Sequence, residues 1–156
     1  MKHLVNLGQT DYTVLVFIPD SSSSTGAGKT GLTEASIDLS YARVETDNDV
    51  TTADVAPASL SALTDAHADW GFKEVSSGDH PGLYRLDIAD PVFATGAWSA
   101  AVTITDAGSN NVPPVTIEFQ LVGLNQTVPA TLATQNVRYT RTGGGTGIDE
   151  VTIEQI

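Results

Sequence analysis

Residues 98–121 read WSAAVTITDAGSNNVPPVTIEFQL, and the secondary structure of this stretch is the plainest in the chain. Apolar and polar residues alternate from Trp98 to Thr105 and again from Val115 to Leu121. Successive side chains of a β-strand point to opposite faces, so this period of two predicts two half-buried strands. Between them, residues 106–111 (DAGSNN) and two prolines predict a turn.

The same alternation recurs nearer the N-terminus. Apolar residues fall on one face of two further segments: Tyr84, Leu86 and Ile88 in one, and Ile37, Leu39 and Tyr41 in the other. Turn signals such as Ser77-Gly78-Asp79 and Asp90-Pro91 separate the segments. Several short strands with this punctuation predict an all-β sandwich or barrel.

The segment Tyr12–Ile18 is different, because it is apolar at nearly every position. A strand of this kind is covered on both faces, so we expect it to be central in its sheet, or covered by a loop or a neighbouring subunit. Tyr12, Val14 and Val16 are therefore candidate assembly contacts.

One segment indicates a helix. In Pro57–His67, Leu60, Leu63 and His67 share one side, and a proline suits the first helical turn, so we expect about two turns in a connection.

The character of the sequence changes after residue 122. We expect residues 1–122 to form the sandwich and residues 123–156 to form a linker followed by a β-hairpin around Gly143–Gly147. A lone hairpin is marginally stable in water, so it should dock on its own domain or on a neighbour. Its candidate contact residues are Val137, Tyr139, Val151 and Ile153.

Composition limits the possible functions. The chain has 156 residues, 19 acidic against 7 basic, and a net charge of −12. Nucleic acids and anionic membranes repel such a chain, so neither is an expected partner. It has no cysteine, which removes disulfides and thiolate sites. The N-terminus does not resemble a signal peptide, because Asn6, Gln9 and Asp11 interrupt its apolar residues.

Gly26-Ala-Gly-Lys-Thr30 ends like a phosphate-binding P-loop. The full motif needs a glycine at position 23, where this chain has Ser23, and a helix after the loop. The residues that follow alternate like a strand instead, so we interpret Ser21–Thr30 as an ordinary Ser/Gly-rich loop.

No motif for cofactor, metal or catalytic chemistry is complete. The three histidines are scattered, and the loop with Asp47, Asp49 and Asp54 lacks the glycine and closing glutamate of a calcium-binding EF-hand. No Gly-x-Ser-x-Gly sequence is present, so we expect no enzyme and no cofactor. A pair of carboxylates that meet only in space stays open as a hydrolase site.

The two tryptophans suggest a different kind of site. Trp98 is in phase with the core residues of its strand, whereas Trp70 precedes Gly71 and is expected to be partly exposed. Core packing is the favoured role of both, and sugar stacking on Trp70 is the alternative.

Three stretches together resemble a known family. They are TGLTEASIDLSYARV at 30–44, GFKEVSSGDHPGLYRLDIAD at 71–90, and the alternating strands that end in Phe119-Gln-Leu-Val. This pattern is similar to a small β-sandwich domain of tailed-bacteriophage virion proteins, and it covers about residues 10–122. The resemblance implies an antiparallel, immunoglobulin-like sandwich in which Gly31 and Gly82 form turns and Phe72 closes one end.

The resemblance also implies a function. We expect a non-enzymatic virion protein, for capsid decoration or for the tail or baseplate, that is assembled in the host cytoplasm. Its partners would be other virion proteins and further copies of itself. The alternative is a carbohydrate-binding or host-attachment module.

Overall fold

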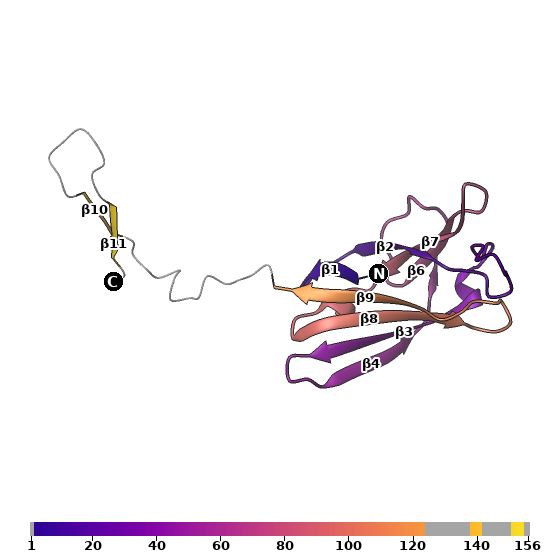
Figure 1. Cartoon of the computed structure of the whole chain (residues 1–156), viewed down its shortest axis with the longest axis horizontal. Coiled ribbons are helices and arrows are strands. Elements are labelled where there is room, and N and C mark those ends of the chain that lie inside the picture. Colours follow the sequence, from indigo (N-terminus) through magenta and orange to yellow (C-terminus); the bar gives the residue numbers. More distant parts are fainter. Residues whose placement is uncertain (1, 124–137, 142–150, 155–156) are drawn as a thin grey trace. The chain divides into compact units, whose positions relative to one another are not determined.

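The structure is a computed structural model that describes residues 2–123, 138–141 and 151–154. The chain divides into two compact units, Met1–Val122 and Gly123–Ile156. The first unit is an all-β sandwich of two sheets (Figure 1), which confirms the expected fold class. Within the described ranges, no helix is long or apolar enough to cross a membrane.

The larger sheet has five strands, in the spatial order β1 (Lys2–Asn6), β9 (Val115–Val122), β8 (Ala97–Asp106), β3 (Ile37–Glu45) and β4 (Val50–Val55). The smaller sheet has four, in the order β2 (Tyr12–Phe17), β7 (His80–Ile88), β6 (Gly71–Ser76) and β5 (Ala58–Ser59). Both sheets are mixed rather than purely antiparallel, because β1 runs parallel to β9 and β5 parallel to β6. Each parallel pair lies at the edge of its sheet.

The predicted alternation is confirmed where it was clearest. Tyr84, Leu86 and Ile88 of β7 are fully buried, and Ile117, Phe119 and Leu121 of β9 are buried opposite them in the same core. The rings of Tyr12 and Phe93 meet edge to face at 5.4 Å, and those of Phe93 and Phe119 at 5.1 Å. Edge-to-face pairs of this kind contribute about 0.5–1.5 kcal/mol each beyond the area that they bury.

The expected helix at Pro57–His67 is wrong. The segment begins with the two-residue strand β5 and continues as turns, while the only helices in the described part are two 3₁₀ turns, η1 (Glu34–Ser36) and η2 (Asp90–Phe93). The guanidinium of Arg85 donates to the carbonyls of Leu63 and Asp65, at 2.6 and 2.9 Å. Because these carbonyls bind Arg85, they do not accept the hydrogen bonds of a helix.

The expected burial of Trp98 is also wrong, since its side chain is 55% exposed. Val44 of β3 is opposite Ser99 of β8, but the next residue, Glu45, is opposite Ala97, so Trp98 is the extra residue of a β-bulge. Ala97 and Ala100 are both buried, which places Trp98 and Ser99 between them on the outer side. The bulge therefore breaks the alternation at Trp98.

Strand β2 does not lie in the centre of its sheet, as one expectation had it, but at the edge beside β7. Val14, Val16 and Ile18 are buried in the core, whereas Leu15 is 58% and Phe17 49% exposed. The apolar residues on the second face of this strand are thus not covered by residues 2–123.

The second unit contains the antiparallel pair β10 (Arg138–Arg141) and β11 (Val151–Glu154), in which Tyr139 is opposite Ile153. This pairing agrees with the hairpin expected from the sequence. Val137 lies outside the described residues.

Candidate interaction surface

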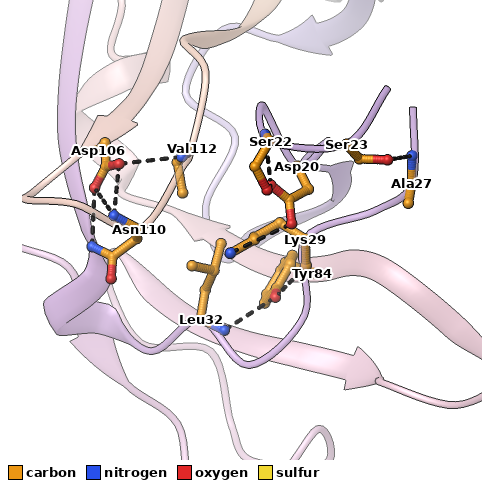
Figure 2. Close-up of polar contacts among 10 residues, drawn as sticks. All are labelled: Asp20, Ser22, Ser23, Ala27, Lys29, Leu32, Tyr84, Asp106, Asn110 and Val112. Atoms are coloured by element: carbon orange, nitrogen blue, oxygen red, sulfur yellow. Dashed lines mark hydrogen bonds and ion pairs between the residues drawn. The ribbon is translucent and has the colours of Figure 1, made fainter. Parts of the chain in front are cut away.

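The Ser/Gly-rich loop is closed by its own side chains (Figure 2). Asp20 Oδ1 accepts hydrogen bonds from the backbone N–H and the hydroxyl of Ser22, at 2.9 and 2.6 Å, and Ser23 Oγ accepts one from the N–H of Ala27. The bonds from Ser22, together with the Lys29 ammonium 3.5 Å from Asp20 Oδ2, hold the pKa of Asp20 below its ordinary value. Lys29 is thus paired with a carboxylate, and the loop leads into η1 and β3 rather than into a phosphate-binding helix.

Gly28 has a packing role in this loop. A Cβ at position 28 would overlap the carbonyl of Pro81 and the Cα of Gly82. The backbones of the loop and of β7 therefore approach each other more closely than any side chain would allow. The glycine that resembles part of a P-loop is explained by this contact.

Tyr84 connects two of the stretches that carry the family resemblance, residues 71–90 and residues 30–44 (Figure 2). Its hydroxyl donates to the carbonyl of Lys29 at 2.7 Å and accepts from the N–H of Leu32 at 3.2 Å. Its ring stacks on Phe72, with ring centroids 4.8 Å apart. Burial raises the pKa of Tyr84 to about 12, and the nearby Glu74 adds to this rise.

Glu74 and Gly31 complete the same cluster. Glu74 Oε2 accepts a hydrogen bond from the N–H of Gly31 at 3.1 Å, and Gly31 has a φ of 75°, which an L-residue rarely adopts. Phe72 is buried at this end of the sandwich, where it was expected to close the core. The residues of the resemblance therefore hold the fold together.

Asp106 organises the turn between β8 and β9 (Figure 2). Its carboxylate accepts hydrogen bonds from the backbone N–H groups of Gly108, Asn110 and Val112, and one from the Asn110 side chain. Loss of hydration alone would raise the pKa of Asp106, but these bonds outweigh that effect and lower it to about 2. Because the carboxylate is occupied by the backbone, this acidic residue is a structural one.

A buried ion pair lies on the outer face of the four-stranded sheet. Arg85 Nε and Nη2 donate to the two carboxylate oxygens of Asp87 at 2.8 and 2.7 Å, and the Asp87 side chain is 0% exposed. Thr13 Oγ1 and the N–H of Ala68 also donate to Asp87, at 2.6 and 3.2 Å. Burial alone would raise the pKa of Asp87, but the hydrogen bonds that it accepts keep the pKa below its ordinary value.

This ion pair holds the connection between β5 and β6 against the sheet. Arg85 binds the carbonyls of Leu63 and Asp65, and Asp87 binds the N–H of Ala68. Together with the Thr13 hydroxyl, these backbone groups occupy the hydrogen-bonding positions of the pair that the structure describes. The role of the pair is to cover one face of β7, which is why Arg85 and Asp87 are buried although the alternation placed them on the solvent side.

The other candidate sites are not assembled in the described residues. Asp47 and Asp49 lie in an exposed turn, and no group of three or more His, Asp or Glu side chains in the described ranges is placed to hold a metal ion. His67 Nδ1 lies 3.3 Å from Asp11 Oδ1, which ties the connection after β5 to the turn before β2. A depression of about 810 Å³ beside β3 and β4 has Glu34, Asp38 and Asp54 in its wall, with no basic residue.

The exposure of the two tryptophans is the reverse of that expected, whereas the favoured core-packing role is confirmed for Trp70 and wrong for Trp98. Trp70 is buried and stacks on Tyr41, with ring centroids 5.7 Å apart. Trp98 is the exposed one. Of the two tryptophans, Trp98 is therefore the one whose ring is accessible for sugar stacking.

The candidate assembly residues of β2 are divided by the pleat of the strand. Val14 and Val16 belong to the core, and the half-buried Tyr12 packs against Phe93, so none of the three offers a free apolar surface. The exposed members are Leu15 and Phe17, which the sequence reasoning did not single out. Tyr139, Val151 and Ile153 lie in β10 and β11, and Val137 outside the described residues.

Leu15 and Phe17 belong to a group of apolar side chains on the outer face of the four-stranded sheet. Leu63, from the connection held by Arg85, and the half-buried Leu83, opposite Phe17 on β7, lie on the same side of the sheet. These residues, which we call the β2 surface, are Leu15, Phe17, Leu63 and Leu83.

Comparison with protein families, curated proteins and solved structures finds no match to this chain.

Proposed function

We propose that this chain is a structural protein of a tailed-bacteriophage particle, located on the capsid surface or in the tail or baseplate, and that it acts through contacts with other virion proteins. The observation that carries the proposal is the cluster around Tyr84. The Gly-Leu-Thr turn, the Gly-Phe-Lys-Glu segment and the Pro-Gly-Leu-Tyr-Arg-Leu strand, which carry the sequence resemblance, meet there through hydrogen bonds and ring stacking.

The contacts among these segments show that the residues of the resemblance pack as one part of the fold. The shared residues are fold-maintaining, so what they support is the architecture of the family and a structural, non-enzymatic role.

Charge and surface chemistry are compatible with this role. A net charge of −12 keeps the free chain soluble until it meets a complementary surface. The chain needs no disulfide, so it can fold in the reducing cytoplasm of a host before it is incorporated. The Arg85–Asp87 ion pair and the Asp106 carboxylate hold loops against the sheets.

Quantitative mass spectrometry of purified particles tests the proposal. The measurement compares copies of this chain with copies of the major capsid protein made by the same virus. A ratio near one indicates a decoration protein, and a small fixed ratio indicates the neck, tail or baseplate. Absence of the chain from purified particles contradicts the proposal.

Trp98 favours glycan binding as a second candidate function. An exposed indole beside polar side chains is the usual platform for a sugar ring, and the backbone carbonyl of Trp98 is held by Gln120 at 2.9 Å. Replacing Trp98 with alanine should abolish binding to a glycan array, whereas replacing the exposed Leu4 on the same sheet should not. Equal binding by both variants, or none by the wild type, rejects this candidate.

A further inference from the structure

The free edge of β2 carries unpaired backbone groups. Phe17 is opposite Leu83 in the ladder with β7, and the N–H of Ile18 donates to the carbonyl of Gly82 at 2.8 Å. In an antiparallel ladder a residue directs its N–H and C=O to the same neighbour, and the next residue directs them away. The even-numbered residues of β2 therefore bind β7, and the N–H and C=O groups of Thr13, Leu15 and Phe17 point outward.

No described strand lies beyond this edge. Soluble monomers protect such edges with charged residues, prolines or bulges. The six residues Tyr12–Phe17 contain no charge and no proline, and the ladder with β7 has no bulge. The edge is therefore unprotected, and it is bordered by exposed leucine and phenylalanine side chains.

We propose that β2 pairs antiparallel with β2 of a second copy of this chain, about a two-fold axis at Leu15. Thr13 then faces Phe17 of the second copy, Leu15 faces Leu15, and Phe17 faces Thr13. All three pairs join residues whose backbone groups point outward, so each pair exchanges two hydrogen bonds and no outward group of these residues stays unsatisfied. The two four-stranded sheets become one continuous sheet.

The register makes the strand complementary to itself. A two-fold axis places the same surface of each copy against the other, so an interface of this type must match itself. The outer face meets this condition as well, because Leu15 of each copy lies beside Leu15 of the other and extends the β2 surface across the axis. The partner strand thus needs no chemistry that β2 does not have.

Charge also favours a second copy at this place. Two chains of net charge −12 repel each other, so they can approach only where the local surface is neutral. The uncharged length of β2 lies between the carboxylates of Asp11 and Asp20, and the latter is already paired with Lys29. Leu15 is four residues from Asp11 and five from Asp20, so the axis lies near the middle of this uncharged stretch.

A symmetric thiol cross-link tests the axis directly, because the chain has no cysteine of its own. In a hydrogen-bonded antiparallel pair the opposite Cα atoms are about 5.5 Å apart, and the Cβ atoms are farther apart than an unstrained disulfide spans, so a short bifunctional maleimide is used instead of oxidation. The full-length Leu15→Cys variant should be cross-linked into a dimer by this reagent. The matched control is Val50→Cys, on the edge strand of the other sheet, where Val50 is 62% exposed.

We expect the Leu15→Cys variant to cross-link at least about tenfold faster than the control, because pairing raises the effective concentration of the two thiols. Similar rates for the two variants overturn the proposal. The Leu15→Lys variant, which opposes two ammonium groups at the axis, should sediment as a monomer at concentrations where the wild type forms dimers. Retention of the dimer by Leu15→Lys also overturns it.

The dimer takes its biological meaning from the proposed virion role, but its test is independent of that role. Cross-linking is measured on the purified chain, whereas the virion role is measured on particles. A dimer from a chain that is absent from particles leaves this inference intact and removes the proposed function. A chain that is monomeric in solution but present in particles overturns this inference and leaves the proposed function intact.

Discussion

Loss of the Asp87 carboxylate should destabilise the sandwich more than loss of any exposed charge. The Asp87→Ala change leaves the guanidinium of Arg85 buried with only the carbonyls of Leu63 and Asp65 as partners. It also removes the acceptor for the Thr13 hydroxyl and the Ala68 N–H. Breaking a buried pair by removing one partner costs about 3–5 kcal/mol, because the remaining charge is uncompensated.

The double replacement Arg85→Met with Asp87→Leu separates this cost from the value of the pair. Apolar residues of similar size leave no buried charge, so the double variant should be more stable than the sum of the two single changes predicts, by about 1–3 kcal/mol. Some loss should remain, since Leu63, Asp65 and Ala68 no longer have their side-chain partners on the sheet.

Urea unfolding of the full-length chain measures these free energies. Trp70 is buried against Tyr41 directly after the connection that Arg85 holds, so its fluorescence reports the unfolding of this region. Limited proteolysis at residues 61–69 provides a local readout, and the exposed Asp38→Ala variant is the control, with an expected change within about 0.5 kcal/mol. An Asp87→Ala variant as stable as the Asp38→Ala control, or single changes that add up to the double, refutes the reasoning.

Three further predictions concern the turn and loop residues. The pKa of Asp106 is about 2 in the folded chain and 3.8 when unfolded, so its contribution to stability is complete above about pH 4 and is lost as the pH falls through about 2. In urea titrations, the Asp106→Asn variant should therefore be less stable than the wild type at neutral pH and should lose less stability on acidification. The pKa of Tyr84 is raised to about 12 from 10.0, so the unfolded state ionises first and stability is lost as the pH rises from about 10 towards 12. The free energy of unfolding of the Tyr84→Phe variant should therefore fall less steeply with pH in this range than that of the wild type. An unchanged dependence on pH contradicts this assignment. Gly28→Ala should cost about 1–3 kcal/mol because its Cβ meets the backbone of residues 81 and 82, whereas Gly78→Ala, which has open space around it, should be nearly neutral in the same thermal melts.

The strands were predictable because their signal is local. In β7 and β9 the alternation of apolar and polar residues identifies the core side, and the structure buries those residues. The turn at Asp106 was also visible, because residues of this type bind nearby backbone groups. Neither prediction required knowledge of what lies on the other side of the strand.

The errors arose where a distant segment changes the environment of a residue. Pro57–His67 has a helical arrangement of leucines, but its carbonyls bind Arg85, about 20 residues later in the sequence. Trp98 is in phase with the core, yet the pairing of β3 with β8 inserts a bulge at that position. Propensity and periodicity contain no information on such pairings.

The candidate interface shows the same division. That Tyr12–Phe17 is an uncharged, apolar strand could be read from the sequence, and this property makes its free edge suitable for a second strand. The sequence did not reveal which of these residues are exposed for contact with a partner. Val14 and Val16 point towards the core, and Leu15 and Phe17 point outward, only because β7 fixes the position of β2 at the edge of the sheet.

The sequence by itself determined that this chain forms β-strands, where most of them lie, and which face of the alternating strands carries the core residues, since all three follow from the period of two along the backbone. Only the tertiary structure decided which strands lie at the edges, that the outer face of β7 is covered through Arg85 and Asp87, and that Trp98 rather than Trp70 is exposed. These features depend on which segments meet in space, and burial and pairing of that kind are properties of contacts between residues far apart in the chain.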